Sequence, residues 1–336
     1  MGDAAEKVEF RQHRIEILLR AEEPIAHHEG SIGNVGVIMR RTMYLPSGRK
    51  TRVPIITGDT VRHGLREAAA LATLEAAGLL DAVHGESALR LLFAGGQMGK
   101  SVSALKLDAY REMCELFPPL ALLGGCAGSR IIPGKLSVSD ALLVCEETAH
   151  RMPAWVADYL TEAEVAVDGA RAHVERVQRV RMDPMLRPTN TALLSSEARA
   201  EVERRLLASD AAATDDDDAG RLATKSSMMP FAFETVCAGS LFFLRIDART
   251  TTLLEGDTLA VMLAAWLHHA RVGGKQGTGH GLLTPMTARG LVRAQIAPAE
   301  LDALSIGIAA PEIERYRAHV AARAERLGVW LAQVQA

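Results

Sequence analysis

The stretch "ITGDTVRHGLREAAA", Ile56–Ala70, decides the first half of the fold, because an extended segment turns there into a long helix. Its Gly-Asp-Thr triplet is expected to turn the chain sharply and to cap the free N–H groups of the helix. The apolar spacing predicts a helix from about Asp59 to Ala77, which Gly78 ends.

The start of this helix carries an unusual set of cations, Arg62, His63 and Arg66. Positive side chains are disfavoured at the positive end of the helix dipole. Arg62 and Arg66 stand four residues apart and therefore share one helix face. Either a carboxylate such as Glu67 or Asp59 neutralises them, or an anionic ligand does. Three cations so close to the helix start favour the ligand.

A second predicted strand–helix pair has a pattern similar to the first. The segment "VCAGSLFFLRID", Val236–Asp247, predicts a strand, and "LEGDTLAVMLAAWLHHA", Leu254–Ala270, predicts a helix that again opens with Gly-Asp-Thr. Another strand is predicted within Val8–Ala21, and a hairpin turned at "PSGR" precedes the first helix. Two strand–helix halves favour an α+β fold with the duplicated plan of the ferredoxin-like kind.

The segment between the two halves has a different pattern. Leu79–Arg179 contains short helical patterns, among them "SVSDALLVCEETAHR", which predict an inserted and mostly helical lobe. The run Asp215–Asp218 repels itself, which predicts a solvated loop. The final 26 residues predict one amphipathic helix.

Composition excludes several classes of protein. The 336 residues are 48% hydrophobic and carry a formal net charge of -3, which argues against a globally basic protein but not against a local basic groove. The four cysteines stand too far apart for a zinc or redox pair and are expected to be reduced thiols. The first residues lack the apolar core of a secretory signal, and no run reaches the roughly 20 apolar residues of a membrane span. A cytoplasmic location is expected.

A glycine-rich loop, "RVGGKQGTGHG", is a candidate anion site at Arg271–Gly281. Glycines allow backbone N–H groups to approach phosphate oxygens, and Lys275 adds charge. The loop lacks P-loop spacing and follows a helix, so an ordinary tight connection is the competing interpretation. The adjacent histidines His27 and His28 diverge along the chain and are not expected to hold a metal ion.

Two further segments, "RVQRVRMDPMLRP" and "KSSMMPFAF", combine cations with Met and Phe. This combination suits single-stranded nucleic acid, because cations follow phosphates while apolar side chains press on bases. In the alternative, Met and Phe belong to the core and the arginines to a solvated face.

The order of these segments resembles the RAMP superfamily of CRISPR effector proteins, specifically the backbone subunit that polymerises along the guide RNA. "IITGDTVRHGLRE" is similar to that family's "iPGSSLKGxLR" segment, and "PFAFETVCAGSLFFLRI" is similar to its "ERVPAGxxF" strand. The glycine-rich loop is also a trait of the family. "GDTVRHGLRE" and "HHEGSIGN" most resemble the type IV version.

The resemblance implies an RRM-like palm at residues 1–78 and 234–336, helical fingers at 79–181 and an extended thumb at 182–233. It implies a subunit that oligomerises along a guide RNA, kinks it with the thumb and presents it for target pairing. The implied partners are the guide (CRISPR) RNA, further copies of the chain, other subunits of the effector complex and, through the guide, a target nucleic acid. Neither a cofactor nor a membrane is implied.

The implied RNA contacts come from all three parts of the chain. They are Ser31, Gly33, Asn34, Arg40, Arg62, His63, Arg66, Arg179, Arg181, Lys225, Ser226, Met228, Met229, Phe231, Lys275 and Gln276.

The resemblance also bears on catalysis. Type III relatives cut target RNA with an aspartate in the loop after the first strand. Here that loop, "AHHEGSIGNVGVIMRR", has Glu29 as its only carboxylate, so a non-catalytic binder is expected. Two alternatives stay open: a RAMP ribonuclease that uses Glu29, His27 or His28, and an unrelated phosphate-ligand enzyme built on the Gly273–Gly281 loop.

Overall fold

The computed structural model describes residues 10–82, 84–96, 107–127, 130–182, 192–212, 228–289 and 311–333. The chain forms two compact units. Unit 1 consists of the residues up to His27, Met39–Val174 and the residues from Val236 onward. Unit 2 consists of His28–Ile38 and Glu175–Thr235, so it holds the "GSIGN" turn together with most of the predicted thumb. The division into palm, fingers and thumb stays a prediction.

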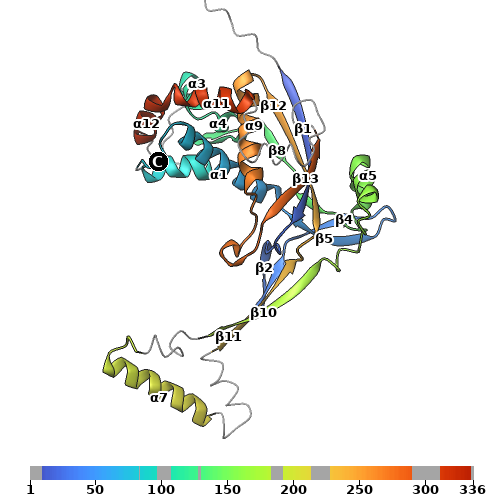
Figure 1. Ribbon diagram of the computed structural model, residues 1–336, viewed down its shortest axis with the longest axis vertical. Helices are drawn as coiled ribbons and strands as arrows, with labels where there is room; N and C mark the ends of the chain where they lie inside the picture. The colour runs from blue at the N-terminus through green and yellow to red at the C-terminus, as the bar shows by residue number, and fades with distance from the viewer. Residues whose placement is uncertain are drawn as a thin grey trace, which may run out of the picture. The chain divides into compact units, whose positions relative to one another are not determined.

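Unit 1 is built on an antiparallel sheet with the strand order β13-β1-β12-β9-β5-β4, in which β8 also pairs with β12. Figure 1 shows the long strands β1 and β12 at its centre. The strands are β1 (Arg11–Ala21), β4 (Arg40–Tyr44), β5 (Lys50–Ile56), β8 (Leu136–Val138), β9 (Ala141–Leu143), β12 (Leu241–Thr250) and β13 (Leu283–Arg289). A separate pair joins β6 (Gly125–Ala127) to β7 (Arg130–Ile132).

Helices cover one face of this sheet, with α1 (Gly58–Ala76) and α9 (Leu253–His268) at its middle (Figure 1). Their packing is extended by α2 (Glu86–Leu89), the π-helix η1 (Arg90–Ala94), α3 (Leu107–Leu116), α4 (Pro119–Leu123), α11 (Pro311–Ala321) and α12 (Ala324–Gln333). One apolar core joins them, in which Phe117, Leu120 and Tyr316 are almost fully buried.

The opposite face is covered by α5 (Ala154–Glu162), which follows the short 3₁₀-helix η2 (Ala149–Arg151). Leu18 and Phe243 are register partners in β1 and β12, and both pack with Trp155 and Val156 of α5. Because side chains alternate along a strand, their neighbours Ile17 and Phe242 face the other helices. Both central strands are therefore apolar on two faces.

Unit 2 has a small sheet of its own with the order β10-β11-β3-β2. The strands are β2 (His28–Ile32), β3 (Val35–Ile38), β10 (Val174–Met182) and β11 (Met228–Val236), and the helix α7 (Ser196–Ala212) lies between β10 and β11 in the chain. β2 and β3 form an antiparallel hairpin, whereas β11 runs parallel to β3.

The main elements predicted from the sequence are confirmed: an α+β fold, the first helix, the hairpin turned at "PSGR", the strand β12 and the second helix. Gly78, with φ +65°, ends the first helix as expected. The helix predicted for "SVSDALLVCEETAHR" is wrong, because this segment supplies the strands β8 and β9 to the central sheet. The single predicted terminal helix is divided into α11 and α12.

Candidate nucleic-acid interface

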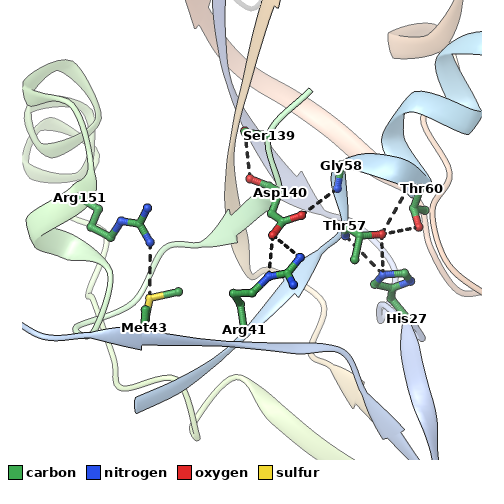
Figure 2. A network of polar contacts seen from close by, with 9 residues as sticks. All are labelled: His27, Arg41, Met43, Thr57, Gly58, Thr60, Ser139, Asp140 and Arg151. Atoms are coloured by element: carbon green, nitrogen blue, oxygen red, sulfur yellow. Dashed lines mark hydrogen bonds and ion pairs between the residues drawn. The ribbon is translucent and has the colours of Figure 1, made fainter. Parts of the chain in front are cut away.

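The N-terminus of α1 is capped from two directions (Figure 2). Thr57 is the N-cap residue, and its hydroxyl accepts a hydrogen bond from the Thr60 backbone N–H. Asp140, from the turn between β8 and β9, accepts the Gly58 backbone N–H through Oδ1 at 3.0 Å. A carboxylate at this place also favours the positive end of the helix dipole.

The second oxygen of Asp140 pairs with Arg41 of β4. Its Oδ2 accepts hydrogen bonds from Nε and Nη2 of Arg41, at 2.9 and 2.8 Å. Asp140 thus ties an edge strand of the sheet to the start of α1 (Figure 2).

The expected capping role of the two Gly-Asp-Thr triplets is wrong. In α1 the cap precedes the triplet, and in α9 the cap is Thr252, which places Gly256-Asp257-Thr258 inside the helix. Asp257 is only 3% exposed and pairs with Arg315 of α11.

His27 contacts the same helix start, and the glycine-rich loop contacts the backbone beside His27. The Thr57 backbone N–H donates to Nε2 of His27 at 3.3 Å, and the Thr57 hydroxyl lies at the same distance from that nitrogen. The glycine-rich loop contacts the residue before His27, because the Gly274 N–H donates to the Ala26 carbonyl at 2.8 Å. Gly273 has φ +75°, and a Cβ there would stand 2.7 Å from the same carbonyl oxygen. Three of the segments singled out in the sequence therefore meet in unit 1.

The loop presents Lys275 and Gln276 to solvent. Lys275 has the left-handed φ of +61°, and Gln276 begins the 3₁₀ turn η4 (Gln276–Thr278). Arg271 anchors the base of the loop through a two-point ion pair with Glu23, at 2.6 and 3.0 Å. Hydrogen bonds from Arg271 hold the pKa of Glu23 below its ordinary value.

Arg62 and Arg66 have partners that neither interpretation of the sequence foresaw. Arg62 donates to the backbone carbonyls of Leu123 and Leu136, and Arg66 donates to those of Leu123 and Gly124 at 3.1 and 2.9 Å. Four carbonyls at the C-terminus of a helix lack helical partners, and here two arginines supply donors to that region of α4.

Arg66 is only 7% exposed, and its guanidinium donates to the backbone carbonyls at the end of α4. Burial, together with the nearby charge of Arg62, lowers the pKa of Arg66 to about 10, which still leaves it charged at neutral pH. Within the described part of the chain its Nη1 has no hydrogen-bond partner. Of the three cations at the start of α1, only His63 is exposed, whereas Arg62 is half-buried and Arg66 is buried.

Other residues of the predicted RNA-binding set lie in unit 2. Ser31, Gly33 and Asn34 are exposed at the β2–β3 turn, where Gly33 has φ +58°. Phe231 stacks on Phe233 with ring centroids 6.1 Å apart, and the Arg179 guanidinium lies 5.8 Å from the Phe233 ring.

Some predicted contacts cannot be placed. Lys225 and Ser226 lie outside the described residues, as does the Asp215–Asp218 run. Arg181, Met228 and Met229 belong to β10 and β11, but their side chains lie outside the described set. Arg40 is half-buried at the start of β4.

The sequence analysis missed Asp140, Arg41 and Thr57, which hold the start of α1. Thr57 could have been found as the N-cap residue directly before the helix. Asp140 stands in a segment that was interpreted as helical, so nothing in its local pattern indicated a contact with α1. Over the described ranges, no group of His, Cys, Asp and Glu side chains is arranged to hold a metal ion. None of the described helices combines the length and apolarity needed to cross a bilayer.

The chain was compared with family models, with curated proteins and with solved structures. No family model matches the chain, and no curated protein matches it. Among solved structures, a chain of a structure described as a Type IV-B CRISPR Complex is similar, with a TM-score of 0.51 and 20% sequence identity. The match covers 81% of this chain and 89% of that chain. At this level of identity the two chains share a fold.

Proposed function

We propose that this protein is a non-catalytic backbone subunit of a CRISPR effector complex, which binds guide RNA and oligomerises along it. The observation that carries the proposal is the fold shared with a chain of the Type IV-B CRISPR Complex across most of both chains. The sequence motifs, in their order along the chain, independently resemble the same class of subunit.

The strand order of unit 1 supports an RRM-like palm. β1 leads through α1 to β8, and β12 leads through α9 to β13, so two strand–helix–strand halves contribute to one sheet. The four strands lie in the order β13-β1-β12-β8, with α1 and α9 packed together. This interleaving is that of the β-α-β-β-α-β plan.

The RNA contacts that we propose are the exposed members of the predicted set. Unit 1 offers Lys275 and Gln276 on the glycine-rich loop and His63 on α1. Unit 2 offers the exposed β2–β3 turn. To these we add Phe231 of β11, a half-buried aromatic ring that suits base stacking. Arg62 and Arg66 act as positioning residues, since they hold the end of α4 against α1.

The proposed mode of binding is independent of RNA sequence. Cations and backbone N–H groups contact phosphates, and aromatic rings contact base faces, so neither reads base edges. Selection of a target then depends on base pairing with the guide.

The proposal is tested by binding of single-stranded RNA to the purified full-length protein over a range of salt concentrations. Two RNAs of unrelated sequence should bind equally well, and Lys275→Ala should weaken both equally while it lowers the slope of log K against log salt by about 0.7. The matched control is Arg326→Ala, which removes an exposed α12 cation paired with Glu112. Absence of RNA binding in all conditions, or strong preference for one sequence, would contradict the proposal.

The non-catalytic assignment has its own test. The assembled complex should leave target RNA intact, and Glu29→Ala should change nothing. Cleavage that Glu29→Ala, His27→Ala or His28→Ala abolishes would establish the ribonuclease alternative instead.

A further inference from the structure

The β4–β5 hairpin concentrates positive charge at the edge of the unit 1 sheet. Between Met39 and Ile56 the sequence has five basic residues and no acidic residue. β4 is the last strand in the sheet order, so one side of the hairpin is not covered by a further strand among the described elements. The hairpin is thus locally basic in a protein of net negative charge, and a local positive potential of this kind favours anionic ligands.

The strand register sorts these residues onto two faces. Residues directly opposite each other in an antiparallel pair point to the same side. Tyr44 pairs with Lys50, Thr42 with Arg52 and Arg40 with Pro54, so three cations, a tyrosine and a threonine share one face. The name "basic face" is used below for Arg40, Thr42, Tyr44, Lys50 and Arg52.

The other face of the hairpin belongs to the protein interior. Met43 is 6% exposed and Val53 is fully buried. Arg41, which shares that face, pairs with Asp140 at the start of α1 (Figure 2). The hairpin is therefore held in place from one side, and the basic face turns away from that anchor.

The basic face has the chemistry of a single-stranded nucleic-acid platform. Tyr44 is 61% exposed, an unusual position for a large aromatic side chain on a β-strand, and Lys50 Nζ lies 5.5 Å from the centre of its ring. Aromatic side chains stack on any base, while neighbouring cations neutralise phosphates. Thr42 adds an exposed hydroxyl between them.

We propose that the basic face of the β4–β5 hairpin is a second contact surface for single-stranded nucleic acid, in which Lys50 and Arg52 bind phosphates and the Tyr44 ring stacks on a base. The class of ligand follows from the proposed function, but the surface is separate from the glycine-rich loop. The rival occupant is an acidic peptide, such as the Asp215–Asp218 segment of a second copy. An acidic peptide would bind the cations, but its binding would not explain the exposed Tyr44 ring.

The test compares two hairpin variants of the full-length protein in RNA binding over a range of salt concentrations. Lys50→Ala/Arg52→Ala should lower the salt slope by about 1.4, because each phosphate contact contributes about 0.7 on single strands. Tyr44→Ile keeps a β-favouring apolar side chain and should weaken binding about fivefold or more at constant salt, with the slope unchanged. Arg326→Ala is the charge control, and thermal midpoints of all variants should match the wild type.

The other outcomes separate this inference from the proposed function. If the hairpin variants bind like the wild type while Lys275→Ala is weakened, the hairpin inference is overturned and the proposed function stands. If the wild type binds no RNA, both fall. If a peptide spanning Ser209–Gly220 binds the wild type and not Lys50→Ala/Arg52→Ala, while RNA binding is equal in both, the surface is a self-docking site instead.

Discussion

Replacement of Arg66 by alanine tests whether this arginine stabilises the fold or contacts RNA. The variant removes two hydrogen bonds to buried carbonyls at the end of α4. The Leu123 carbonyl keeps Arg62 as a donor, whereas the Gly124 carbonyl loses the hydrogen bond from Arg66. A buried carbonyl without a partner costs about 1–3 kcal/mol.

Two other effects act in opposite directions. The lost side chain leaves a cavity between α1 and α4, which costs about 1–2 kcal/mol for the aliphatic part of the side chain. Removal of a buried charge relieves a desolvation cost, which is the cause of the lowered pKa of Arg66. We therefore expect Arg66→Ala to lower the free energy of unfolding by about 2 kcal/mol.

Denaturant unfolding of the purified protein measures this change. His63→Ala, one of the exposed neighbours on α1, is the matched control and should stay within about 0.5 kcal/mol of the wild type. RNA binding by folded Arg66→Ala should keep the wild-type salt slope. An unchanged unfolding midpoint together with a lowered salt slope would refute the structural role and restore Arg66 as a phosphate contact.

Three further changes test other parts of the structure. Asp140→Ala removes the carboxylate that accepts the Gly58 N–H at the start of α1, so it should lower the free energy of unfolding in denaturant by about 1–2 kcal/mol. Arg41→Ala should cost under about 1 kcal/mol, because its ion pair with Asp140 is half-exposed. Equal effects of the two substitutions would contradict this ranking. Glu23 has a lowered pKa in the fold, so its contribution to stability is present above about pH 4.5 and is lost as the pH falls through the folded pKa. The stability difference between wild type and Glu23→Gln should therefore shrink in acid, and a difference independent of pH would oppose the pairing with Arg271. Gly58→Ala should destabilise the protein by about 1–3 kcal/mol, because the added Cβ would lie 2.4 Å from a backbone oxygen of β8. Gly256→Ala, which has open space around it in α9, should stabilise the protein by about 0.5–1 kcal/mol. The reverse order would be inconsistent with the close approach of α1 to β8.

The sequence predicted those elements whose pattern is long enough to repeat. α1, α9 and β12 each span ten residues or more, so their periods of 3.6 or 2 are readable. The strands β8 and β9 have three residues each, and an apolar run of that length is compatible with a helix as well. Their membership in the sheet depends on pairing with β12, which lies far away in the chain.

The candidate site was predictable in its segments and not in its contacts. The segments around His27, Thr57 and Gly273 were singled out by composition and do meet in unit 1. The partners of Arg66 are backbone carbonyls 57 and 58 positions away, which no side-chain pattern encodes. The two faces of the β4–β5 hairpin likewise required the strand register.

The proposal that this chain coats a guide RNA is tested by the nucleic-acid content and the mass of the protein purified at moderate salt with its guide and partner subunits. We expect an ultraviolet spectrum dominated by nucleic acid and a mass of several subunits, which falls to smaller species after ribonuclease treatment. Sequencing of the released RNA should then return guides of diverse sequence. A protein-only spectrum with the mass of a single chain in the presence of guide and partners would contradict the claim.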